Sequence, residues 1–202
     1  MVEVIHLDSC LLRGLLDHED QQDTRSKARR LVNSMTGSVF RVSILAVGEV
    51  LGKMAEERGA AASGDAASEL SRLFRGGRLQ LYGIGKGSEV SSLVTALMAA
   101  DGLLSPADAF LVACALADEE ATVFATLDQD IIHSRIVKSH AAQRALRILD
   151  ADRARWKDGI AKIGGTAHKN LGVVTDPRAA AMNPIESLGS GLGQIMDSTM
   201  GK

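Results

Sequence analysis

Four acidic side chains interrupt or end hydrophobic stretches of this sequence: Asp8, Glu49, Asp108 and Asp128. The stretches read VIHLD, ILAVGEVL, SPADAFLVACAL and VFATLD. Burying an ionised carboxylate is costly unless a partner compensates its charge. A hard divalent cation such as Mg²⁺ or Mn²⁺ compensates several carboxylates at once, because it prefers oxygen ligands. The four residues therefore predict a metal site of the kind that supports hydrolysis of phosphate esters.

Helix capping is the alternative explanation for three of these carboxylates. Asp8 and Asp128 each stand directly before an expected helix, where an acidic side chain is favourable. The segment Ser105-Pro106-Ala107-Asp108 has the spacing of a capping box. Glu49 is different, because it lies in the middle of an expected helix and is the only charged residue of VSILAVGEVLG. A wet stripe between apolar faces is the alternative for Glu49.

Hydrophobic runs that alternate with helical patterns predict the elements that position these carboxylates. Strands are expected at residues 2–8, 38–42, 79–84, 121–128 and 146–149. Helices are expected from Ser9 onward and at residues 23–35, 43–58, 65–74, 88–97, 105–117 and 129–144, with Ile44, Val47, Leu51 and Met54 facing inward in one of them. The alternation predicts a three-layer α/β/α domain with a mainly parallel central sheet. In such sheets, sites form at the carboxyl ends of strands, where Asp8 and Asp128 stand.

The chain has 202 residues, of which 46% are hydrophobic. That length predicts one domain at residues 1–150 and a C-terminal extension at residues 151–202, basic at first and then rich in Gly, Ala and Met. Cys10 and Cys114 show no spacing typical of metal binding or of a disulfide framework, which favours a reducing compartment. The early Glu3, His6 and Asp8 exclude a signal peptide core, and no uncharged run approaches the roughly 20 residues of a membrane span, so we expect a cytoplasmic protein without membrane contact.

The charge of the chain is unevenly distributed. The net charge is −2, yet residues 133–169 carry nine basic and three acidic side chains. A basic segment of this kind is typical of a track for a polyanion such as RNA. A solvated helical face is the other interpretation of the same pattern.

Four stretches of the chain resemble PIN-domain nucleases, the family of the VapC-toxin-like ribonucleases: HLDSCLL, VSILAVGEVL, SPADAFLVACAL and VFATLDQDI. The resemblance extends over about residues 2–150. It implies that the catalytic and metal-binding residues are Asp8, Glu49, Asp108 and Asp128, with Asp130 as a further candidate metal ligand and with Ser9 and Thr126 in supporting positions. Cys10 stands where Ser or Asn is common in the family, so we expect different hydrogen bonding to Asp8.

The resemblance implies a Mg²⁺- or Mn²⁺-dependent endoribonuclease that leaves a 5′-phosphate and a 3′-hydroxyl. It further implies a homodimer and the toxin role in a toxin–antitoxin pair, with an antitoxin protein as partner. Because aromatic residues make up 3% of the chain, RNA contacts are expected mainly at phosphates. The candidate basic residues for these contacts are Arg25, Arg29, Arg135 and Lys138.

Two other functions compete with the ribonuclease. One is a non-catalytic PIN-fold module that binds nucleic acid or serves in assembly. The other is a Mg²⁺-dependent phosphatase with Asp8 as nucleophile. That chemistry normally needs a second Asp two residues later, and Cys10 occupies this position.

Overall fold

The structure is a computed structural model of the chain that describes residues 2–16, 22–84 and 86–152. Contacts among residues divide the chain into two units, Met1–Asp158 and Gly159–Lys202. The described residues all belong to the first unit. The C-terminal extension expected at residues 151–202 lies outside the described residues, except for its first two positions.

Five parallel strands form the central sheet of the first unit, in the order β3-β2-β1-β4-β5. The strands are β1 (Val4–Leu7), β2 (Val39–Ser43), β3 (Leu79–Tyr82), β4 (Val123–Thr126) and β5 (Arg147–Asp150). Every residue of β4 is buried, as expected for a central strand of a sheet that is covered on both faces. The predicted parallel sheet is confirmed.

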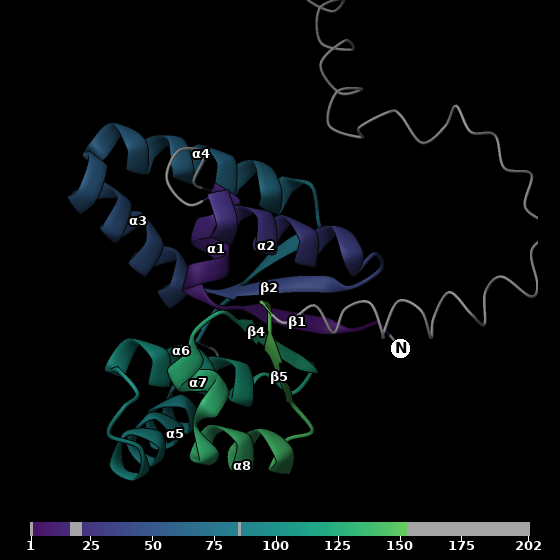
Figure 1. The fold of residues 1–202 in the computed structure, drawn as a ribbon, viewed down its shortest axis with the longest axis vertical. Helices are drawn as coiled ribbons and strands as arrows, with labels where there is room; N and C mark the ends of the chain where they lie inside the picture. Colours follow the sequence, from purple (N-terminus) through teal and green to yellow (C-terminus); the bar gives the residue numbers. More distant parts are fainter. Residues whose placement is uncertain (1, 17–21, 85, 153–202) are drawn as a thin grey trace, which may run out of the picture. The chain divides into compact units, whose positions relative to one another are not determined.

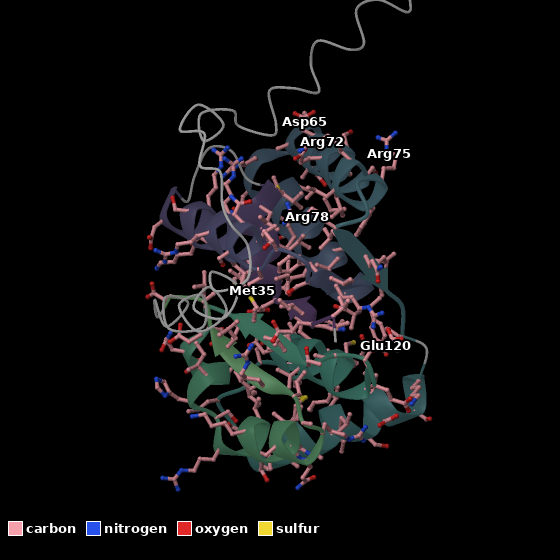
Figure 2. All side chains as sticks on the ribbon, turned by 90° about the vertical axis from the view of Figure 1, so that its right-hand side faces the viewer. Met35, Asp65, Arg72, Arg75, Arg78 and Glu120 are labelled. Atoms are coloured by element: carbon pink, nitrogen blue, oxygen red, sulfur yellow. The ribbon has the colours of Figure 1, made fainter. Side chains whose placement is uncertain are left out.

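Helices cover both faces of this sheet and complete the predicted three-layer α/β/α arrangement (Figure 1). The helices α1 to α4 lie on one side, and α5 to α8 lie on the other. Their bounds are α1 (Ser9–Leu16), α2 (Gln22–Ser34), α3 (Ile44–Arg58), α4 (Ala60–Arg75), α5 (Gly87–Ala100), α6 (Pro106–Ala117), α7 (Gln129–His133) and α8 (Arg135–Gln143). Figure 2 shows how α4 directs Asp65, Arg72 and Arg75 to the surface, while Ala66 and Leu70 of the same helix are buried.

The chain order of the strands places a topological switch point between β1 and β4. From β1 the chain adds β2 and then β3 on one side, and it returns to the other side of β1 for β4 and β5. The connections that leave β1 and β4 therefore run in opposite directions, which opens a crevice at the carboxyl ends of these two strands. The backbone N–H of Asp8 donates to the carbonyl oxygen of Ala125 at 3.0 Å and closes the strand pair at this edge.

Three local predictions are wrong. Residues 129–144 form two helices, because the Ser134 hydroxyl accepts the N–H of Val137 and starts α8 anew. Helix α4 begins at Ala60, five residues before the expected start, because Gly59 adopts a φ of 90° and ends α3 while the alanines that follow favour helix. Ile44, expected inward, is 44% exposed at the first turn of α3. None of the helices in the described ranges is long and apolar enough to cross a membrane.

Candidate metal and nuclease site

Asp8 is a buried carboxylate at the switch point of the sheet. It follows β1 directly, and the residue is 2% exposed. Burial raises the pKa of Asp8, and the nearby charge of Asp108 raises it further. Three hydrogen bonds act in the opposite direction: the N–H of Ser9 donates to Oδ1 at 2.7 Å, and Oδ2 accepts the Thr126 hydroxyl at 2.5 Å and the Cys10 thiol at 3.1 Å.

Thr126 links the two strand ends on either side of the crevice. Its Oγ1 accepts the backbone N–H of Asp128 at 2.9 Å and donates to Asp8. The residue is fully buried at the last position of β4. Because the N–H of Asp128 occupies an acceptor position, the hydroxyl proton is directed to the carboxylate of Asp8. The supporting position expected for Thr126 thus corresponds to a direct contact with Asp8.

The Cys10 thiol donates a hydrogen bond to Oδ2 of Asp8 at 3.1 Å. Burial raises the pKa of the Cys10 thiol, and the adjacent Asp8 carboxylate raises it further. The sulfur therefore keeps its proton and serves as a hydrogen-bond donor. Cys10 and Cys114 are both free cysteines.

Asp108 lies in the first turn of α6, where both explanations of this residue apply. The Ser105 hydroxyl accepts the N–H of Asp108 at 3.2 Å and donates to its Oδ2 at 2.6 Å, so the predicted capping motif is present. The side chain is nevertheless half-buried, and burial raises the pKa of Asp108. Repulsion from Asp128 and from Glu49 raises this pKa as well. The charge of Asp108 therefore interacts with the charges of all three other carboxylates.

Glu49 and Asp128 both have protein partners in this conformation. The Lys53 ammonium lies 2.6 Å from Oε1 of Glu49, one helical turn along α3, and the Glu49 side chain is 21% exposed. Asp128 caps α7, since its Oδ1 accepts the N–H of Asp130 at 2.7 Å. Lys53 was missed in the sequence, although its spacing of four residues from Glu49 is a recognisable signal for a helical ion pair.

Asp130 points to a different feature. It is exposed, and it lines a pocket of about 280 Å³ with His133 and Arg135. The neighbouring charges that raise the pKa values of Asp8 and Asp108 are those of Glu49, Asp108 and Asp128, whereas Asp130 lines the pocket. Among the basic residues expected to contact RNA, Arg29, Arg135 and Lys138 are exposed, whereas Arg25 is half-buried.

His6 belongs to a separate buried cluster. Its Nε2 lies 2.7 Å from Oδ2 of Asp118, and the Arg41 guanidinium donates to the same oxygen at 2.7 Å. Burial alone would raise the pKa of Asp118, but the hydrogen bonds from His6 and Arg41 outweigh it and lower that pKa to about 2. The hydrogen bonds within this cluster explain why His6, a polar residue, is buried in β1.

The donor set fits a hard divalent cation in its chemistry but is not assembled as ligands. Among residues 2–16, 22–84 and 86–152, no group of three or more His, Cys, Asp or Glu side chains is placed to hold a metal ion. The carboxylates are instead bonded to other side chains: Glu49 contacts Lys53, and Asp108 contacts Ser105. Carboxylate oxygens are nevertheless the ligands that Mg²⁺ and Mn²⁺ prefer. Burial raises the pKa of Asp8 and of Asp108, repulsion from neighbouring carboxylates raises both further, and a cation would relieve that repulsion.

Comparison with solved structures identifies the fold as the PIN-domain fold. VapC20 of Mycobacterium tuberculosis, described as a sarcin-ricin loop cleaving toxin, is 19% identical, with a TM-score of 0.50. The match covers 63% of this chain and 92% of VapC20. VapBC2 of Rickettsia felis, solved bound to a DNA fragment from the promoter, is 12% identical over 66% of this chain and 94% of the other, with a TM-score of 0.48. No protein-family model matches the chain, and no curated protein matches it in sequence.

Proposed function

We propose that this protein is a Mg²⁺- or Mn²⁺-dependent endoribonuclease and the toxin of a toxin–antitoxin pair. The observation that carries the proposal is the buried Asp8 carboxylate at the switch point of a PIN fold, which accepts hydrogen bonds from Ser9, Cys10 and Thr126. Burying the Asp8 carboxylate has no structural advantage by itself, because loss of hydration disfavours its charged form, and the charge of Asp108 adds repulsion. An antitoxin partner and a homodimer belong to the same proposal.

The residues of this chain have distinct tasks in the proposed reaction. Asp8, Glu49, Asp108 and Asp128 would hold the cation, which neutralises the phosphodiester and activates water. The donors Ser9, Cys10 and Thr126 fix the orientation of Asp8 and favour its ionised form. Fixing a charged group in advance lowers the cost of reorganisation during the reaction.

Lys53 has a task of its own in this scheme. It neutralises Glu49 and carries a positive charge that also acts on Asp108. The ammonium thus limits repulsion within the cluster while no cation is bound. Lys53 contacts only Oε1 of Glu49, so Oε2 would serve as the ligand oxygen for the cation.

RNA cleavage by matched variants tests the proposal. The purified protein is incubated with structured RNA in Mn²⁺ or in EDTA, beside Asp8→Asn, Asp108→Asn and the control Asp65→Asn, which changes an exposed carboxylate on α4. We expect cleavage by the wild type and the control only, only with Mn²⁺, and with 5′-phosphate ends. Circular dichroism verifies that the variants are folded. Equal cleavage by all four proteins would contradict the proposed site.

A second candidate function is a PIN-fold module that binds nucleic acid without cleaving it. The specific observation in its favour is that the described residues offer no preassembled group of metal ligands. The same experiment separates the two functions. RNA binding without cleavage, in Mg²⁺ as well as in Mn²⁺, would support the module.

A further inference from the structure

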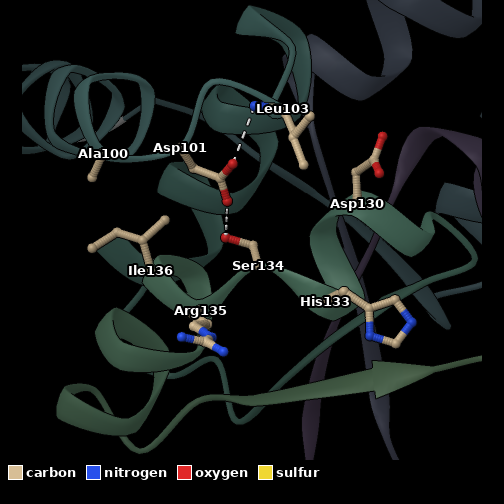
Figure 3. Close-up of a pocket in the computed structure, with 8 residues that line it drawn as sticks. All are labelled: Ala100, Asp101, Leu103, Asp130, His133, Ser134, Arg135 and Ile136. Atoms are coloured by element: carbon tan, nitrogen blue, oxygen red, sulfur yellow. Dashed lines mark hydrogen bonds between the residues drawn. The ribbon is translucent and has the colours of Figure 1, made fainter.

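A pocket of about 280 Å³ includes Asp130 in its lining, two residues after Asp128 of the proposed site. Figure 3 shows the residues that line this pocket. Its lining comes from three places in the chain: the end of α5 with Asp101, the connection to α6 with Leu103, and the α7–α8 segment with Asp130, His133 and Arg135. A volume near 300 Å³ is at the lower end for small-molecule pockets, which suits one flat group rather than a large ligand.

Two residues that line this pocket lie close in the sequence to residues of the proposed site. Asp130 stands two residues after Asp128, in the same short helix α7. Leu103 stands two residues before Ser105, the residue that bonds the carboxylate of Asp108. A nucleic acid strand held at the carboxylates would therefore have a neighbouring nucleotide at this pocket.

The floor of the pocket is formed by side chains that are hydrogen-bonded to other residues of the protein. Asp101 accepts the N–H of Leu103 at Oδ1, 3.1 Å away, and the hydroxyl of Ser134 at Oδ2, 2.5 Å away, and Figure 3 shows both bonds. Ser134 in turn accepts the N–H of Val137. Ser134 thus joins the end of α5 to the start of α8 and has no proton left for a ligand.

The groups left for a ligand have three kinds of chemistry. Leu103 is 76% exposed, a large apolar side chain in water at the pocket wall. Asp130 is exposed and makes no side-chain hydrogen bond or ion pair within the described residues. His133 and Arg135 are exposed as well and supply positive or potentially positive charge. An apolar wall, a carboxylate acceptor and cations match a nucleotide, with its base, its N–H groups and its phosphate.

We propose that this pocket binds an unpaired guanine next to the scissile phosphate, with Asp130 as the residue that reads the base. This inference rests on the proposed ribonuclease function. Guanine is the base whose Watson–Crick edge presents two neighbouring N–H donors, and a carboxylate accepts such a pair with two parallel hydrogen bonds. Leu103 packs against the face of the base, and Arg135 binds an adjoining phosphate.

RNA binding in EDTA, without cleavage, tests the pocket by fluorescence anisotropy. The probes are labelled oligouridines with one central guanosine, inosine or adenosine. Inosine retains one of the two N–H groups of the guanine edge. We expect the wild type to bind the guanosine probe about tenfold more tightly than the adenosine probe, with inosine between them, because one bidentate base contact is worth about tenfold or more.

The variants assign this preference to the pocket. Asp130→Asn should bind the guanosine and adenosine probes about equally, and Leu103→Ser should weaken binding of every probe with a base in the pocket. The matched controls are Asp65→Asn and Leu81→Ser, since Asp65 is exposed and Leu81 is 49% exposed outside the pocket. Both controls should behave as the wild type does.

Four results would overturn the assignment, and they differ in what else they affect. A wild type that binds and cleaves RNA without base preference, or a preference that Asp130→Asn retains, overturns the pocket alone. Loss of Mn²⁺ binding in Asp130→Asn overturns it by making Asp130 a metal ligand. A wild type that neither binds nor cleaves RNA overturns the proposed function, and the pocket with it.

Discussion

Removal of the Thr126 hydroxyl should change the pH at which the site binds a cation. Thr126→Val keeps the shape of the side chain but deletes the donor to Asp8 and the acceptor for the N–H of Asp128. A hydrogen bond to a charged group contributes about 1.5–3 kcal/mol. One pKa unit corresponds to about 1.4 kcal/mol, so loss of this donor should raise the pKa of Asp8 by about one unit or more. Mn²⁺ binding requires the ionised form, and its pH midpoint should rise accordingly.

The overall stability should fall at the same time. The second lost contact is at Asp128, which is half-buried, so water can replace part of it. We therefore expect the free energy of unfolding to fall by about 2–3 kcal/mol, most of it from the contact with Asp8. Thr126→Ser is the matched control, because it keeps both hydrogen bonds and deletes one buried methyl group at a cost of about 1 kcal/mol.

Two measurements separate the hydroxyl from the methyl group. Urea denaturation gives the free energy of unfolding, and the thermal shift caused by Mn²⁺, recorded from pH 4 to pH 8, gives the binding midpoint. Thr126→Val should shift the midpoint upward, whereas Thr126→Ser should keep that of the wild type. Equal midpoints in the valine and serine variants would show that the Thr126 hydroxyl does not control the ionisation of Asp8.

Two further predictions concern charge at the site. Burial raises the pKa of Asp8 above its ordinary value of 3.8, so ionised Asp8 destabilises the metal-free fold, and stability is lost as the pH rises through the folded-state pKa. In urea denaturation, Asp8→Asn should therefore have the same free energy of unfolding as the wild type near pH 4 and a higher one near pH 7. A wild type that is more stable than Asp8→Asn at pH 7 would contradict the expected effect of Asp8 ionisation. Lys53→Met should tighten Mn²⁺ binding in calorimetry by up to about fivefold, since the half-exposed pair with Glu49 is worth about 1 kcal/mol at most. Lys53→Arg should keep the wild-type affinity, and weaker binding by the methionine variant would assign Lys53 a different role.

The sequence predicted the elements that carry strong periodic or apolar patterns. The strands around Ile5 and Phe124 are apolar runs that only a covered parallel sheet accommodates, and the positions of Asp8 and Asp128 followed from the strand ends. The start of α6 was also predictable, because Ser105 and Pro106 form a local capping signal that needs no tertiary partner.

The features that the sequence did not reveal depend on contacts between distant segments or on side-chain orientation. The pocket is formed by residues near 101 and near 134, and no local sequence pattern indicates the contact between Asp101 and Ser134. The helix break at Ser134 depends on a hydroxyl that could equally lie inside a helix, and the hydrogen bond that it donates to Asp101 favours the capping position. The sequence offered no capping explanation for Glu49, and the structure shows that Lys53 pairs with it.

Binding of Mn²⁺ to the metal-free protein tests the central claim most directly, because the claim assigns the cation to four named carboxylates. Electron paramagnetic resonance measures free Mn²⁺ during a titration at pH 7.5, for the wild type, for Asp8→Asn and Asp108→Asn, and for the control Asp65→Asn. We expect saturable binding by the wild type and the control, and at least a roughly tenfold loss in each site variant. Binding that is unchanged in both site variants would contradict it.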